Sequence, residues 1–153
     1  MVTEFKSVDD ILDFAIKNEE GAVHFYTDLS EKMKKPAIVQ IFKDFAREEE
    51  GHKAKLLDIK SGKLLITSKE KVMDLKISDY IDTDIQIKEN LDYQDALVLA
   101  MRKEKQAFKL YTDLASKTDN EQIKKLLLAI AQEEAKHKLR FELEYDEIVL
   151  TDN

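Results

Sequence analysis

Cysteine is absent from this 153-residue chain, and glycine and proline are scarce, with 3 and 1 residues. Without cysteine the chain can form no disulfide, thiolate metal site or cysteine nucleophile of its own. Few glycines and prolines mean few turn signals, which favours long helices. No run of about eighteen apolar residues occurs, so the sequence predicts no membrane-spanning helix. Residues 1–6 carry no apolar signal-peptide stretch, and we expect a cytoplasmic protein.

The charge balance is acidic, because 32 aspartates and glutamates against 25 lysines and arginines give a formal net charge of −7. This balance argues against nucleic acid as a partner, since a phosphate-binding surface needs clustered positive charge. Solubility accounts for most acidic residues on a protein surface. The informative carboxylates are therefore those at positions that the helical pattern assigns to the interior.

The chain contains an internal repeat with an offset of 85 residues. Residues 11–60 align with 96–145 without a gap, and 15 of these 50 positions are identical. The offset is longer than the period of about 20–50 residues that is typical of solenoids. We interpret the repeat as a duplicated helical hairpin. The sequence thus predicts one all-α domain, 1–153, with hairpins at 8–60 and 92–148 and a linker at 61–91.

Apolar residues recur at steps of three and four in four segments, which is typical of amphipathic helices. Start signals agree: Ser7 suits an N-cap, Pro36 a first helical position, and Thr118 with Glu121 a capping box. The linker is long enough to cross along a four-helix bundle. Within it we expect a short helix near 69–75 and solvated aspartates at 77–85.

Each apolar stripe is interrupted by residues that are costly to bury. A lone glutamate interrupts the first and third stripes, and a Glu-x-x-His motif interrupts the second and fourth. Residues three apart lie on one helix face, so each motif points the same way as its stripe. We expect four carboxylates and two imidazoles in a shared interior. The candidate metal-binding and catalytic residues are Glu19, Glu49, His52, Glu104, Glu134 and His137.

Metal ions would explain these buried groups. Unpaired buried carboxylates are strongly unfavourable or become protonated. Two divalent cations would balance the four negative charges. Oxygen and imidazole ligands without thiolate suit iron or manganese, and zinc is a third option. Six protein ligands for two metals also leave coordination positions for a small molecule.

A purely structural role for the two motifs is the alternative. A single Glu-x-x-His in a chain this rich in glutamate is weak evidence for a metal site. However, two of the 3 histidines have it, at equivalent positions of the repeat. We therefore favour the metal site. Glu48 and Glu133 also recur, each four residues before a histidine, and are alternative ligands, whereas His24 is expected to face solvent.

The arrangement resembles the ferritin-like di-metal carboxylate proteins across both hairpins. Tyr26 and Tyr111, each seven residues after a lone glutamate, make it most similar to the rubrerythrin branch. The resemblance implies that Glu49 and Glu134 bridge two irons. The two tyrosines either donate hydrogen bonds to ligand carboxylates or are core aromatics, and the sequence leaves both open. The terminal ligands that the resemblance implies are Glu19, His52, Glu104 and His137.

Two departures from the rubrerythrin pattern affect the expected activity. Rubrerythrins that act as peroxidases carry an extra glutamate one turn from the helix-three ligand, and a rubredoxin domain with four cysteines. Here Met101 and Ala107 stand one turn either side of Glu104, and cysteine is absent. A separate electron donor, such as a rubredoxin, is therefore needed.

The leading functional hypothesis is a di-iron oxidoreductase that reacts with hydrogen peroxide or dioxygen, similar to a rubrerythrin peroxidase. A second hypothesis is iron binding with ferroxidase activity, and a third is a metal-sensing or structural module without turnover. A dimanganese catalase is a further option. From the family we also expect a homodimer, in which the long linker permits exchange of hairpins.

Overall fold

Four long helices make up most of the chain. The computed structural model describes residues 5–65, 71, 75–80 and 92–152. The helices are α1 (Val8–Lys32), α2 (Pro36–Ser61), α4 (Tyr93–Lys117) and α5 (Glu121–Asp152), and η1 (Ile77–Tyr80) is a short 3-10 helix. None of the helices in the described part of the chain is long and apolar enough to cross a membrane.

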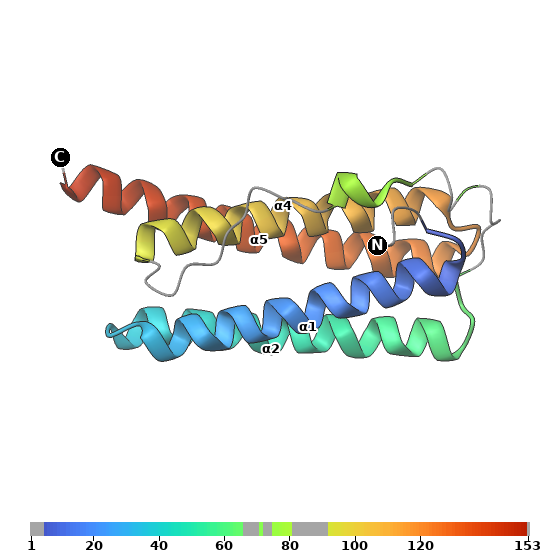
Figure 1. Cartoon of the computed structure of the whole chain (residues 1–153), viewed down its shortest axis with the longest axis horizontal. Coiled ribbons are helices and arrows are strands. Elements are labelled where there is room, and N and C mark those ends of the chain that lie inside the picture. The colour runs from blue at the N-terminus through green and yellow to red at the C-terminus, as the bar shows by residue number, and fades with distance from the viewer. Residues whose placement is uncertain (1–4, 66–70, 72–74, 81–91, 153) are drawn as a thin grey trace.

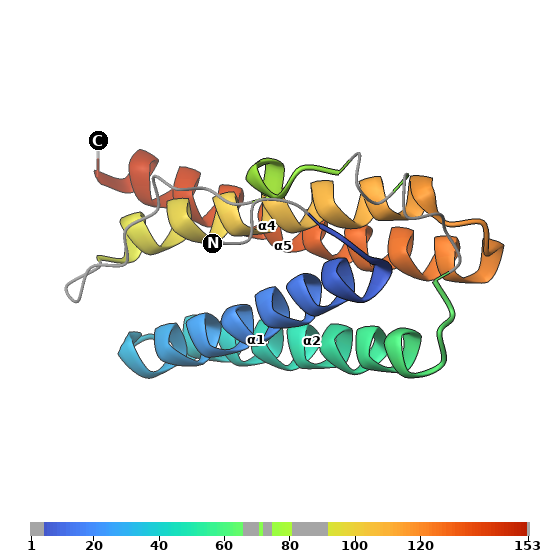
Figure 2. The ribbon, with the colours of Figure 1, turned by 45° about the vertical axis from the view of Figure 1, so that its right-hand side comes forward.

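The helices pair as two antiparallel hairpins, α1 with α2 and α4 with α5 (Figures 1 and 2). The expected all-α bundle of two hairpins is therefore confirmed. In Figure 1, α2 ends at one end of the bundle and α4 begins at the other, as a crossover connection requires. The helix expected near 69–75 and most of the aspartate-containing stretch 77–85 lie outside the described residues.

Local capping explains where the helices begin. The Ser7 hydroxyl accepts a hydrogen bond from the Asp10 backbone N–H at 3.1 Å, and Pro36 occupies the first turn of α2. For α5 the predicted capping box of Thr118 with Glu121 is wrong, because the N-cap residue lies two positions after Thr118. The Asn120 side chain, not Thr118, accepts from the backbone N–H groups of Gln122 and Ile123, at 3.0 and 3.2 Å. Asparagine is as good an N-cap as serine, and it stands directly before the first residue of α5.

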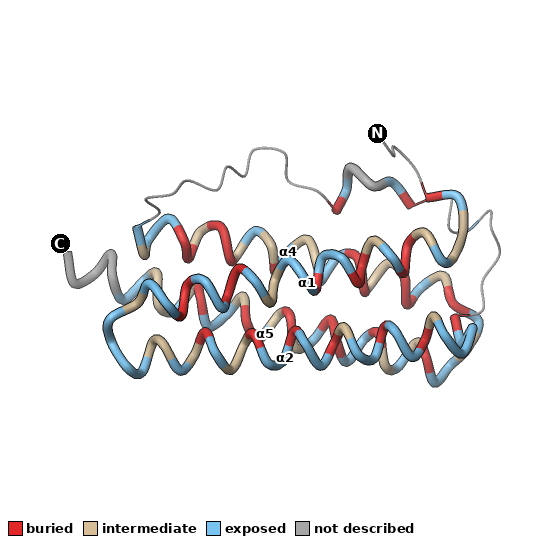
Figure 3. Tube along the Cα trace, turned by 60° about the horizontal axis from the view of Figure 1, so that its bottom comes forward, coloured by how far each residue is buried: buried red, intermediate tan, exposed pale blue. Residues whose placement is uncertain are grey.

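Buried apolar side chains form two clusters along the bundle. Figure 3 shows in red all buried residues of the helices, apolar and polar. The leucine-rich cluster includes Leu12, Leu56, Leu114 and Leu127. The aromatic cluster includes Tyr26, Phe42, Leu97 and Phe141. Along every helix, the candidate metal ligands lie between the residues of the two clusters. The bundle therefore has a polar layer between two apolar ends.

Candidate metal centre

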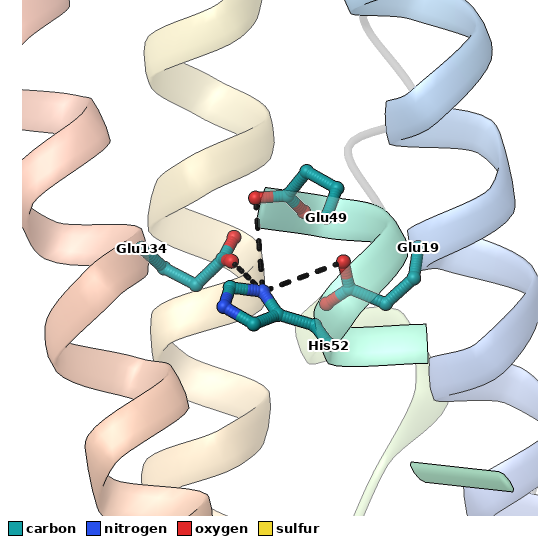
Figure 4. Close-up of side chains that lie close together, drawn as sticks. All are labelled: Glu19, Glu49, His52 and Glu134. Carbon is teal, nitrogen blue, oxygen red and sulfur yellow. Dashed lines mark ion pairs between the residues drawn. The ribbon is translucent and has the colours of Figure 1, made fainter. Parts of the chain in front are cut away.

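All six candidate ligands lie in this polar layer. Each of the four helices contributes, and every one of the six side chains is only 1% to 3% exposed. Figure 4 shows the carboxylates of Glu19, Glu49 and Glu134 arranged around the ring of His52. The structure therefore brings together the full set that the sequence predicts, although binding of a metal by these residues stays a prediction.

The ligand atoms form two overlapping groups. One atom from each of Glu19, Glu49, His52 and Glu134 lies within 4.8 Å of the others. The same holds for Glu49, Glu104, Glu134 and His137. Glu49 and Glu134 are common to both groups, which fits two neighbouring cations with these two carboxylates between them.

Both imidazoles direct Nδ1 toward the carboxylates. His52 Nδ1 lies 2.8 Å from Glu134 Oε1 and 3.7 Å from Glu19 Oε2. His137 Nδ1 lies 3.1 Å from Glu49 Oε1 and 3.5 Å from Glu104 Oε1. A neutral imidazole can coordinate a metal through Nδ1 when its proton is on Nε2. Nδ1 is therefore the atom that each histidine would offer to a metal in this layer.

The outer nitrogen of each histidine faces a carboxylate of the opposite hairpin. His52 Nε2 lies against Glu133, and His137 Nε2 lies against Glu48. Glu48 and Glu133 are about half exposed and lie on the outer side of the rings. The sequence left open that Glu48 and Glu133 are ligands, but neither belongs to the two ligand groups. A carboxylate that accepts Nε2–H holds the ring in place and fixes the tautomer that metal binding needs.

The two tyrosines also reach across the hairpins. Tyr26 on α1 donates a hydrogen bond to Glu104 Oε1 on α4, and Tyr111 on α4 donates to Glu19 Oε1 on α1. Both rings are fully buried. The hydrogen bonds that the first role requires are therefore present, and both rings also belong to the apolar clusters. Each hydroxyl satisfies one oxygen of a terminal carboxylate and leaves the other oxygen toward the centre.

The atoms that remain unpaired show that a metal pair fits this layer. Every candidate ligand has one buried atom without a hydrogen bond, and four of these atoms meet only as His–Glu ion pairs, His52 Nδ1 with Glu134 Oε1 and His137 Nδ1 with Glu49 Oε1. An unpaired buried polar atom costs about 1–3 kcal/mol. Cations would satisfy all of them at once, and carboxylate and imidazole donors suit iron, manganese or zinc. The unpaired atoms are Glu19 Oε2, Glu49 Oε1, His52 Nδ1, Glu104 Oε2, Glu134 Oε1 and His137 Nδ1.

Burial and mutual repulsion control protonation in the absence of metal. Burial raises the pKa of Glu49 and Glu134 well above the ordinary value, and the neighbouring carboxylates raise both further. Burial disfavours the charged form of His137, but Glu104 and Glu49 outweigh it and raise its pKa to about 11. The metal-free cluster therefore keeps protons at neutral pH, which cations must displace when they bind.

Neighbouring side chains act in the opposite direction on Glu19. Burial alone would raise the pKa of Glu19, but its interactions with Glu49, His52 and Tyr111 outweigh burial, and the net pKa is lowered. Glu19 is therefore an ionised carboxylate, ready to bind a cation.

Residues outside the layer agree with the sequence analysis. His24 is exposed, as expected. Met101 packs against the aromatic cluster and Ala107 against the leucine-rich cluster, so neither supplies a further ligand. The sequence did not predict that Phe45 stacks on His137, with ring centroids 4.1 Å apart. Nothing in the periodicity marks this contact, because it joins α2 to α5.

Similar solved structures define the class of protein. A Thermotoga maritima protein, described as a candidate ferritin-like diiron-carboxylate protein, superimposes with a TM-score of 0.77 and 22% identity, over 96% of this chain and 99% of its own. A hypothetical protein from Pyrococcus furiosus has a TM-score of 0.72 and 26% identity, over 94% of this chain and 90% of its own. The fold is therefore the ferritin-like four-helix bundle.

The family follows from the sequence model that matches. The rubrerythrin model matches residues 10–145, and the chain belongs to the rubrerythrin family. No protein among the curated sequences matches. The matched range contains all six candidate ligands and both tyrosines.

Proposed function

We propose that the protein is a di-iron carboxylate oxidoreductase that reduces hydrogen peroxide, or dioxygen, with electrons from a separate donor protein. The observation that carries the proposal is the set of six inward-facing, unpaired ligand atoms in one buried layer. A bound iron pair would supply two electrons, one from each ion, which is what reduction of one peroxide to two waters consumes. The description of the Thermotoga maritima protein agrees with this choice of metal.

The chain's own residues would position the metals and admit the substrate. Four carboxylates supply the negative charge that two divalent cations need, and six ligands leave coordination positions open. Tyr26 and Tyr111 hold the terminal carboxylates, while Glu48 and Glu133 hold the imidazoles. A cavity of about 410 Å³ between α2 and α5, lined by Glu48, Glu133 and His137, opens beside this layer. It is large enough for peroxide and water.

Metal analysis followed by single-turnover kinetics tests the proposal. Elemental analysis of protein loaded with Fe(II) without oxygen should give two irons per chain, and Glu49→Ala should lose them. Stopped-flow mixing with one equivalent of peroxide should then oxidise the iron pair, and reduced rubredoxin should restore it.

Other outcomes would replace the proposal. Slow reaction with peroxide, combined with uptake of many irons per chain in air, favours iron storage with ferroxidase activity. Two manganese ions in the purified protein favour catalase chemistry. Absence of bound metal after loading refutes a di-metal function altogether.

A further inference from the structure

The ligands of the centre are symmetric, but the side chains packed around them are not. The repeat pairs each ligand on one hairpin with an identical residue on the other. Apart from Tyr26, whose counterpart is Tyr111, four rings in or packed against the aromatic cluster have aliphatic counterparts at the offset of 85 residues. The unequal pairs are Phe42 with Leu127, Phe45 with Ile130, Phe141 with Leu56, and Tyr93 with Val8.

These rings form a continuous path from the centre toward the surface. The Tyr26 hydroxyl touches Glu104, and the Tyr26 ring lies nearly parallel to Phe42, with centroids 6.3 Å apart and an interplanar angle of 14°. Phe42 meets Tyr93 edge to face, with centroids 6.2 Å apart. Both separations lie within the range for aromatic pairs in direct contact. One phenyl ring therefore connects a tyrosine at the ligands to a tyrosine near the surface.

Tyr93 ends this path where solvent and partners have access. It lines a cavity of about 560 Å³ at the end of the bundle, together with Lys34, Lys35 and Arg140. Its hydroxyl lies 3.4 Å from Glu144 Oε2, and Arg140 holds Glu144 at 2.8 Å. A phenol with a carboxylate beside it has a ready proton acceptor.

The described residues form no such path on the other half of the site. Tyr111 donates to Glu19 just as Tyr26 donates to Glu104. Among the residues that the structure describes, however, Tyr111 makes no ring contact, and it lies in the leucine-rich cluster. Within the described part of the chain, aromatic rings therefore connect one side of the symmetric centre to the surface and not the other.

We propose that Tyr93, Phe42 and Tyr26 form the route by which electrons from an external one-electron donor enter the metal layer. The inference rests on the proposed function. Tunnelling through atoms in van der Waals contact is faster than across gaps, and Phe42 fills the space between the two tyrosines. The tyrosines can lose an electron, whereas Phe42 serves only as the bridging medium.

Each step of this route balances. Tyr93 passes one electron inward through Phe42 and Tyr26 to the oxidised metal layer, and its phenolic proton moves to Glu144. The donor then returns one electron to the Tyr93 radical, and Glu144 returns the proton. Two such cycles replace the two electrons that the metal layer gives when one hydrogen peroxide and two protons become two waters.

Peroxide given without a donor tests the route. The first equivalent of peroxide takes two electrons from the irons of iron-loaded protein, and a second equivalent must draw its electrons from side chains. Tyr93 should then lose an electron, visible as a tyrosyl radical by electron paramagnetic resonance and as Tyr93 oxidation or dityrosine by mass spectrometry. Phe42→Leu, which copies Leu127 of the repeat, should lose the oxidation of Tyr93. Phe14→Leu is the matched control, because Phe14 packs against the leucine-rich cluster, and it should leave Tyr93 oxidation unchanged.

Iron content and circular dichroism confirm that each variant is folded and loaded. Tyr93 oxidation that persists in Phe42→Leu, or that is spread equally over Tyr80 and Tyr145, overturns the route. If peroxide oxidises the irons but leaves Tyr93 intact, the route fails and the proposed function stands. If peroxide does not oxidise the irons, both fail.

Discussion

Replacing Glu134 by glutamine is expected to stabilise the metal-free protein while it abolishes metal binding. Glu134 is only 1% exposed, and its Oε1 has no hydrogen-bond partner. Burial, together with the charges of Glu104 and Glu49, raises its pKa well above the ordinary value. The ionised form is therefore unfavourable without a cation, and a neutral amide of the same shape removes that cost.

The size and the pH dependence of the effect follow from the same contacts. An unsatisfied buried group costs about 1–3 kcal/mol, so Glu134→Gln should raise the free energy of unfolding by that amount at pH 8. Glu134 in the folded protein holds its proton to a higher pH than in the unfolded chain. The gain should shrink as pH falls, because the carboxyl group becomes neutral and then resembles the amide.

Urea unfolding of chelator-treated protein, followed by circular dichroism at pH 6 and pH 8, measures this effect. Glu142→Gln on the same helix is the control, because Glu142 is half-buried and pairs with Lys138 outside the polar layer. It should change stability by less than about 0.5 kcal/mol. A metal-free Glu134→Gln protein that is less stable than wild type at pH 8, or that still binds two metals, would refute this account of the layer.

Two further predictions concern the histidines. The pKa of His137, raised to about 11, means that the folded protein keeps a proton that the unfolded chain loses above pH 6.5. Between pH 7 and 9, each proton that the folded, metal-free protein retains should therefore lower its free energy of unfolding by about 1.4 kcal/mol per pH unit. Metal-loaded protein should show a flatter pH profile in the same urea titration. Glu48→Gln and Glu133→Gln should each weaken metal binding about 10–100-fold with little change in fold, as measured by competition with a chelator. Unchanged affinity in both variants would contradict the orienting role.

Much of the fold was determined by local patterns that the sequence carries directly. The helices follow from apolar residues at steps of three and four, because that spacing places them on one face of any α-helix. The six ligands follow from the interruptions in those stripes and from the repeat, since Glu19 and Glu104 occupy the same position in two copies. Helix starts are also local, but Thr118 and Asn120 are both good N-cap residues, and the spacing of Thr118 to Glu121 favours the wrong one.

Other properties depended on which helices meet across the bundle, and only the tertiary structure decided them. Glu48 and Glu133 recur as regularly as the ligands, but their position outside the imidazoles comes from the pairing of α2 with α5. The choice of Nδ1 over Nε2, and the hydroxyl contacts of Tyr26 and Tyr111, also join residues on opposite hairpins. The aromatic path is the clearest case, because Tyr26, Phe42 and Tyr93 come from three helices. Sequence periodicity fixes which face of a helix is buried, whereas contacts between helices depend on packing, which no single helix specifies.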